Sequence, residues 1–284
     1  NAYDAAKHGA LPLMADARVG LEALSAELGT RSWQQDVGAR KAAWFAQVDP
    51  LTDAPAPDDN ALPTDMQVVG AVQRAAGPDT VVMCAAGTMP GELHKLWKAG
   101  RPRSYHMEYG FSCMGYEIAG ALAIKMAEPE RDVVCMVGDG SYLMMNSELA
   151  TAVMMGVKIT VVITDNRGFG CINRLQMGTG GAEFNCLLDD TVHEQPSDID
   201  FVGHAASLGA EAVKAANIAE LETALARAKE AKGPFVVVID TDPYPSTPHG
   251  GHWWEVAVPE VSERESVRAA RQAYEAGLTK QTLA

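Results

Sequence analysis

The sequence predicts an α/β fold in which a doubly wound parallel sheet carries helices on both faces. Apolar runs of strand length, among them residues 81–85, 133–138 and 159–164, alternate with segments of helical periodicity. This alternation is typical of parallel strands joined by crossover helices. Two of the runs lead into polar residues, Asp139 and Asn166. The carboxyl ends of the strands form the ligand crevice of such sheets, so these two residues mark the expected site.

The composition is that of an ordinary globular protein with an acidic surface. The chain has 284 residues, 47% of them hydrophobic and 21% charged, and a formal net charge of −14. A surface of that sign repels nucleic-acid backbones, which argues against such a partner. No apolar run reaches the roughly 18 residues of a membrane span, so we expect no membrane role. The five cysteines include no C-x-x-C pair, which predicts reduced thiols and a cytoplasmic location.

The chain before residue 64 is expected to be helical and then extended. Residues 1–48 show helical spacing, with one helix around residues 17–24 and a second near residues 32–48. Residues 49–63 contain four prolines and four aspartates with few apolar residues, which indicates a linker. Two helices do not make a domain, so they must pack on other parts of the protein.

A regular α/β pattern occupies residues 64–245 and begins where Thr64 and Gln67 form a capping-box signature. The expected elements are, in order, a helix at 66–76, a strand at 81–85, a helix at 90–98, a strand at 104–109, a helix at 114–127, a strand at 133–138, a helical segment, a strand at 159–164, a Gly-rich loop at 167–190, a helix at 197–208, a strand at 210–213, a helix at 218–231 and a strand at 234–240. Residues 246–284 form a tail, a possible lid or interface.

Asp139 and Asn166 together predict a magnesium site. Asp139 stands between Gly138 and Gly140, where a ligand can approach the backbone closely and where the amides of a following helix favour an anion. A carboxylate repels a phosphate unless a cation separates them, and Mg²⁺ fits that position. Asn166 supplies a second oxygen, and the Gly168 carbonyl could supply a third. A G-D-G tripeptide alone is as readily a structural turn; an asparagine 27 residues later, at the end of another strand, makes the pattern specific.

These motifs resemble those of thiamine diphosphate enzymes, in which G-D-G followed by Asn binds the diphosphate and magnesium. Residues 112–131 resemble the same part of the acetolactate synthase and benzoylformate decarboxylase group. Residues 104–123, 138–156 and 165–176 more closely resemble the trihydroxycyclohexane-1,2-dione hydrolases of inositol catabolism. The general resemblance covers residues 64–245, which implies the diphosphate-binding domain of this family.

The resemblance also implies roles for particular residues. It assigns magnesium to Asp139, Asn166 and Gly168. It places Met114 beneath the cofactor, where a bulky apolar residue holds the two cofactor rings in a bent conformation. Without the resemblance, Met114 would be assigned to the hydrophobic core. The Ser112 carbonyl would accept a hydrogen bond from the aminopyrimidine. The expected diphosphate contacts are Gly87, Thr88, Gly138, Gly140 and Ser141.

Other residues keep two interpretations each. Glu117 could contact a polyhydroxylated substrate or position a water, or it could be a capping or ion-paired acid. His106 could face the crevice, although a lone histidine is more often structural. The tail carries an H-x-x-H pattern that is not by itself a metal site, and its aromatic residues suit a lid as well as an interface. These tail residues are His249, His252, Trp253 and Trp254.

The resemblance implies that a part of the active site lies outside these residues. Enzymes of the family use a glutamate to activate the cofactor, and that residue belongs to a separate pyrimidine-binding domain of the same protein or of a partner subunit. The beginning of the chain resembles the tail of the family's middle domain, so we expect the C-terminal part of a longer homodimeric or homotetrameric protein that is inactive alone. The catalytic residue is therefore unknown, with Glu117 and His106 as weak candidates.

The preferred function is hydrolytic C–C cleavage of a polyhydroxylated cyclic dione, trihydroxycyclohexane-1,2-dione, to 5-deoxyglucuronate in myo-inositol catabolism, with thiamine diphosphate and Mg²⁺ as cofactors. A 2-oxo acid decarboxylase or an acetolactate synthase-like enzyme is the alternative of the same class. A non-catalytic cofactor-binding or oligomerisation subunit is the alternative of another class. A nicotinamide-binding domain is disfavoured because residues 86–91 lack the G-x-G-x-x-G pattern.

Overall fold

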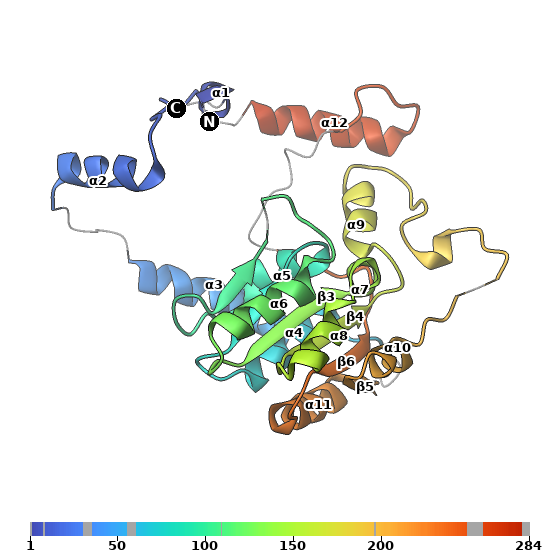
Figure 1. Cartoon of the computed structure of the whole chain (residues 1–284). Coiled ribbons are helices and arrows are strands. Elements are labelled where there is room, and N and C mark those ends of the chain that lie inside the picture. The colour runs from blue at the N-terminus through green and yellow to red at the C-terminus, as the bar shows by residue number, and fades with distance from the viewer. Residues whose placement is uncertain are drawn as a thin grey trace. The chain divides into compact units, whose positions relative to one another are not determined.

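The computed structural model describes residues 2–7, 9–30, 36–55, 61–108, 110–195, 197–248 and 258–279. The chain divides into two compact units (Figure 1). One comprises residues 1–44 and 252–284, and the other, which we call the α/β unit, comprises residues 45–251. The described residues of the first unit contain α1 (Ala2–Lys7), α2 (Ala17–Leu28) and α12 (Glu265–Leu278), together with the beginning of a helix that continues into the α/β unit.

The α/β unit is built on a six-stranded sheet whose strands are all parallel, in the order β2-β1-β3-β4-β6-β5. The chain leaves β1 for β2 on one side and leaves β3 for β4 on the other, so the sheet is doubly wound and the predicted fold class is confirmed. The strands are β1 (Val81–Cys84), β2 (Tyr105–Met107), β3 (Val133–Gly138), β4 (Thr160–Asp165), β5 (Glu211–Ala215) and β6 (Phe235–Asp240).

Helices cover both faces of this sheet (Figure 1). Side chains alternate between the faces of a strand, so Val81 and Met83 join the core under α6 (Tyr116–Ala127), α8 (Glu148–Met155) and α10 (Phe201–Ser207). The other face lies under α4 (Asp65–Ala75), α5 (Thr88–Leu96) and α11 (Ile218–Glu230), which pack on one another. Burial on both faces explains why the central strands read as continuous apolar runs.

Helix α3 (Val37–Thr52) extends four residues beyond the expected end at Val48, although Pro50 lies in its last turn. A proline there loses only one backbone hydrogen bond, and the Asp53 amide still donates to the Asp49 carbonyl at 3.1 Å. Residues 49–52, expected as the start of a linker, therefore continue the helix. The remaining expected linker includes residues 56–60, which lie outside the described residues.

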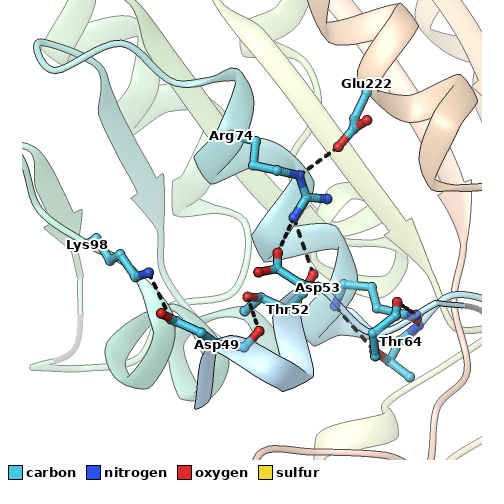
Figure 2. A network of polar contacts seen from close by, with 9 residues as sticks. Asp49, Thr52, Asp53, Thr64, Arg74, Lys98 and Glu222 are labelled. Atoms are coloured by element: carbon cyan, nitrogen blue, oxygen red, sulfur yellow. Dashed lines mark hydrogen bonds and ion pairs between the residues drawn. The ribbon is translucent and has the colours of Figure 1, made fainter. Parts of the chain in front are cut away.

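Polar contacts hold this end of α3 against α4 and the segment that follows α5 (Figure 2). The Arg74 guanidinium binds Asp53 at 2.7 Å and Glu222 at 2.8 Å, and Lys98 binds Asp49 at 2.8 Å. These pairs are partly exposed, so each contributes little by itself. The backbones of α3 and α4 also pack closely here. A Cβ added at Gly70 of α4 would lie 2.4 Å from the Thr52 carbonyl oxygen of α3.

Two helices appear where the sequence suggested irregular structure. The expected Gly-rich loop at 167–190 contains α9 (Gly170–Gly178) and a 3₁₀ turn at Leu188–Asp190. Its glycines lie at the ends of α9 and beyond, where they permit sharp turns, and the residues between them have helical spacing. The expected tail contains α12. The prediction of a continuous loop was wrong because the glycines mark helix ends.

Candidate functional site

A pocket of about 200 Å³ lies at the carboxyl ends of β1, β3 and β4. Strand connections reverse direction between β1 and β3, and ligands of doubly wound sheets bind at that point. Ten residues proposed from the sequence line the pocket, together with seven others. The proposed residues are Gly87, Thr88, Ser112, Met114, Gly138, Asp139, Gly140, Ser141, Asn166 and Gly168, and the additional ones are Ala86, Met89, Thr164, Phe169, Gly170, Cys171 and Ile172.

Asp139 is a buried acid with a hydrogen bond to one of its two carboxylate oxygens. It begins helix α7 (Asp139–Met144) directly after β3, and its Oδ2 accepts a hydrogen bond from the Gly168 amide at 2.8 Å. Its Oδ1 is buried and has no hydrogen-bond partner among the described residues. Burial, reinforced by the neighbouring Asp165 carboxylate, raises the pKa of Asp139 to about 7. A cation at Oδ1 would stabilise the ionised form of this group.

Asn166 follows β4 and brings a second buried oxygen to the same pocket. The pairing of Gly138 with Thr164 sets the ends of β3 and β4 side by side. The Asn166 Oδ1 atom is also buried without a hydrogen-bond partner in the described part of the chain. Two unpartnered oxygens on one pocket fit a hard cation such as Mg²⁺. No group of three His, Cys, Asp or Glu side chains among the described residues could hold a metal, so the remaining ligands would be backbone, phosphate or water oxygens.

Besides α7, which begins at Asp139, two longer helices begin at the pocket. Helix α5 presents Thr88 and Met89, and helix α9 presents Gly170, Cys171 and Ile172. The first amides of a helix lack acceptors within the helix and favour an anion. Both helices have nine residues, which supports a developed dipole at each start. This arrangement can bind a diphosphate group.

Sequence reasoning missed the contribution of α9 and of Arg174 within it. The Arg174 Nη2 atom donates to Thr88 Oγ1 at 2.9 Å, and Nη1 donates to the Pro243 carbonyl. Because Arg174 occupies a lone pair of the Thr88 hydroxyl, the hydroxyl proton is free to point at a ligand. Helical spacing between the glycines of the supposed loop was the signal that could have identified this helix.

Met114 lies on the pocket wall in a tightly turned segment. Ser112 has φ +51° and Gly115 has φ +94°, both in the left-handed region. A Cβ added at Gly115 would lie 2.9 Å from the Met145 Cβ. Such conformations persist where the surrounding structure holds them, and they are frequent at binding sites. Met114 is half-buried and borders the pocket, as the proposed support for a cofactor requires.

The two weak catalytic candidates, Glu117 and His106, have different surroundings. Glu117 is 1% exposed and accepts hydrogen bonds from backbone amides and a hydroxyl, as in its capping interpretation. The ring of His106 stacks on Tyr116 with 6.1 Å between centroids, which suits a structural role. Neither borders the pocket described above. The four tail residues His249, His252, Trp253 and Trp254 lie outside the described residues.

Residues 85–239 match the family model described as thiamine pyrophosphate enzyme, C-terminal TPP binding domain; thiamine pyrophosphate is another name for thiamine diphosphate. The match covers more than half of the chain and includes all the pocket-lining residues named above. The chain therefore belongs to the thiamine pyrophosphate enzyme family and contains its TPP-binding domain.

Curated relatives and a solved structure extend this comparison. The chain is 37% identical to the 3D-(3,5/4)-trihydroxycyclohexane-1,2-dione hydrolase of Halalkalibacterium halodurans, an alignment that covers 96% of this chain and 47% of that protein. It is 45% identical to the enzyme of the same name from Bacillus licheniformis, over 72% of this chain and 32% of that protein. The chain thus spans about half the length of the first relative, and its alignment with the second covers about a third of that protein.

The fold also resembles that of a solved enzyme. Rhodococcus jostii RHA1 thiamine diphosphate-dependent 4-hydroxybenzoylformate decarboxylase matches with a TM-score of 0.58 and 20% identity, over 68% of this chain and 35% of that one. At this identity the likeness supports the fold alone. In the described ranges, no helix has the length and apolar character to cross a membrane.

Proposed function

We propose that this chain supplies the diphosphate- and magnesium-binding half of an enzyme that hydrolyses a C–C bond of a cyclic 1,2-dione. The observation that carries the proposal is the pair of unpartnered buried oxygens, Asp139 Oδ1 and Asn166 Oδ1, in a pocket bordered by the N-termini of α5, α7 and α9. The names of the relatives support trihydroxycyclohexane-1,2-dione as substrate. The product of the proposed reaction is 5-deoxyglucuronate, in myo-inositol catabolism.

The residues around the pocket take separate parts in this proposal. Asp139, Asn166 and the Gly168 carbonyl hold Mg²⁺, while the first amides of α5, α7 and α9 and the Thr88 hydroxyl bind the diphosphate. Gly138 leaves room beside the backbone, the absence of a side chain at Gly140 admits the Phe169 ring, and Met114 and Ser112 contact the ring end of the cofactor. When bound, thiamine diphosphate supplies a nucleophilic carbon that can add to a carbonyl group of the substrate.

The complete site needs a second domain under this proposal. The cofactor-activating glutamate comes from a pyrimidine-binding domain, in the same polypeptide or in a partner subunit of a homodimer or homotetramer. The helices before the α/β unit then belong to a preceding middle domain. The whole enzyme should therefore be tested against the dione, pyruvate and benzoylformate. Turnover of pyruvate or benzoylformate in place of the dione would favour an acetolactate synthase-like enzyme or a 2-oxo acid decarboxylase.

Calorimetric titration of thiamine diphosphate, with and without Mg²⁺, tests the metal assignment on this chain. We expect Asp139→Ala to abolish the part of the affinity that depends on Mg²⁺. Asp132→Ala is the matched control, because Asp132 is exposed and precedes the other end of the same strand. Magnesium-independent binding that Asp139→Ala leaves unchanged would refute the metal site.

A further inference from the structure

A buried carboxylate lies directly behind the pocket. Glu117, in the first turn of α6, accepts hydrogen bonds from the Gly115 amide at 2.8 Å, the Ser141 hydroxyl at 2.7 Å and the Ala86 amide at 3.4 Å. The three donors belong to the turn before α6, to helix α7 and to the segment after β1. One side chain thus links three walls of the pocket.

The three donors require a charged acceptor. An ionised carboxylate only accepts hydrogen bonds, so it can meet all three at once. A glutamine of the same shape would direct an N–H toward a group that is itself a donor. Burial of a charge is costly, and the three hydrogen bonds compensate for that cost. A helix cap alone would need no such burial, because first-turn acids also stabilise a helix at the surface.

The hydrogen bonds of Glu117 lie between two parts of the pocket wall, and this position is more informative than the role of Glu117 as a cap of α6. Gly115 is adjacent to Met114, the proposed support for the cofactor rings, and its amide also donates to Ser141 Oγ at 2.9 Å. Ser141 follows Asp139 by two residues in α7, at the proposed diphosphate and metal end. Glu117 and Ser141 therefore connect the two ends of the pocket.

We propose that Glu117 is a positioning residue that fixes the spacing between the ring-supporting turn at Met114–Gly115 and the diphosphate anchor at Asp139–Ser141. This inference rests on the proposed function. Because the Ser141 hydroxyl proton is donated to Glu117, Ser141 meets the diphosphate through its backbone amide. A ligand that spans both ends of the pocket depends on the spacing, whereas a ligand at the diphosphate end alone does not.

Two probes separate these cases, namely thiamine diphosphate and inorganic pyrophosphate, each titrated with excess Mg²⁺ into the 284-residue chain. We expect Glu117→Gln to weaken thiamine diphosphate binding about tenfold and pyrophosphate binding less than about twofold. Ser141→Ala breaks the same link from its other end, so it should produce the same selective loss. The double variant should then add little to either single one, since both remove one link.

Glu220→Gln is the matched control, because Glu220 accepts a backbone hydrogen bond in the first turn of α11, away from the pocket. It should change neither affinity. Equal losses for both probes, or no loss in Glu117→Gln and Ser141→Ala, would overturn the positioning role. If the unaltered chain binds neither probe, the proposed function fails and the inference fails with it. If Glu117→Gln does not fold, Ser141→Ala alone decides between the outcomes.

Discussion

At the scale of single residues, the pocket depends on a position that only glycine can occupy without strain. Gly168 has φ +146°, and a Cβ there would lie 2.4 Å from the Cys186 carbonyl oxygen. Its amide also holds Asp139 Oδ2. One glycine therefore joins Asp139, the proposed metal ligand, to the strand-like contact between Gly168 and Leu187.

Gly168→Ala should destabilise the fold by about 1–3 kcal/mol, because the new methyl group clashes with backbone and the dihedral is strained. It should also weaken binding of thiamine diphosphate with Mg²⁺, since the Asp139 contact moves. Denaturant unfolding and calorimetry measure the two effects. Gly178→Ala, at the end of α9, is the control, because no described atom lies within 4 Å of its added Cβ. Similar losses in both variants would contradict the role of Gly168.

Asp65 is a second buried acid, away from the proposed metal ligands. It is 0% exposed, and neither oxygen has a hydrogen-bond partner among the residues that the structure describes. Burial raises its pKa to about 7, with Arg174 opposing and Glu92 reinforcing the effect. The folded state therefore disfavours the ionised form of this group.

Asp65→Asn should increase stability at pH 8 by as much as about 4 kcal/mol, since each pKa unit is worth about 1.4 kcal/mol. The folded pKa exceeds the unfolded one, so the penalty is absent below the unfolded pKa of 3.8, grows with pH, and is complete above about 7. Urea unfolding of both proteins at pH 4 and pH 8 measures the change. Asp189→Asn, at an exposed position, should show no such dependence on pH. A constant difference between Asp65→Asn and the unaltered chain would contradict the assignment.

At the scale of elements, helix α9 changes the character of the site. Without it the segment after β4 would be a loop with mobile amides, whereas the helix directs its first amides together. Arg174, on the same helix, reaches Thr88 at the start of α5. The two helices therefore hold each other in place around the proposed diphosphate position.

Replacing Cys171 tests the amides of α9. Cys171→Pro removes one amide while the first turn of a helix tolerates proline, so binding of Mg²⁺ and thiamine diphosphate should weaken about tenfold with little loss of helix. Cys171→Ala removes the thiol and keeps the amide, so its affinity should match that of the unaltered chain. Calorimetry gives the affinities and circular dichroism the helix content. Equal affinities in the two variants would exclude this amide from the site.

At the scale of the whole molecule, the pocket belongs entirely to the α/β unit. A ligand that binds only the folded state stabilises it by about 2.7 kcal/mol at a concentration one hundred times its Kd. For a unit of this size that corresponds to an increase in Tm of roughly 5–10 °C. Stabilisation by the cofactor should therefore be confined to this unit.

Hydrogen exchange with and without thiamine diphosphate and Mg²⁺ checks this expectation by region. Protection should increase in the strands and in α5, α7 and α9, and it should stay unchanged in α2 and α12. Chelation of Mg²⁺ should reverse most of the gain. Protection that increased equally in α2 and α12 would show that the ligand acts beyond the α/β unit.

The sequence by itself determined the parallel sheet and the residues at its strand ends. Apolar runs bury on both faces, and Asp139 and Asn166 follow two of those runs directly, so local pattern was sufficient for both. Pocket-lining residues could be assigned as far as the motifs extended.

Only the tertiary structure decided which side chains support the residues that line the pocket. The contact of Glu117 with Ser141 joins residues 24 positions apart, and that of Arg174 with Thr88 joins residues 86 positions apart. Helix α9 was missed because its ends carry glycines, which are equally compatible with a loop. Periodicity and spacing describe neighbours along the chain, whereas these contacts arise from strand order and helix packing, which bring distant residues together.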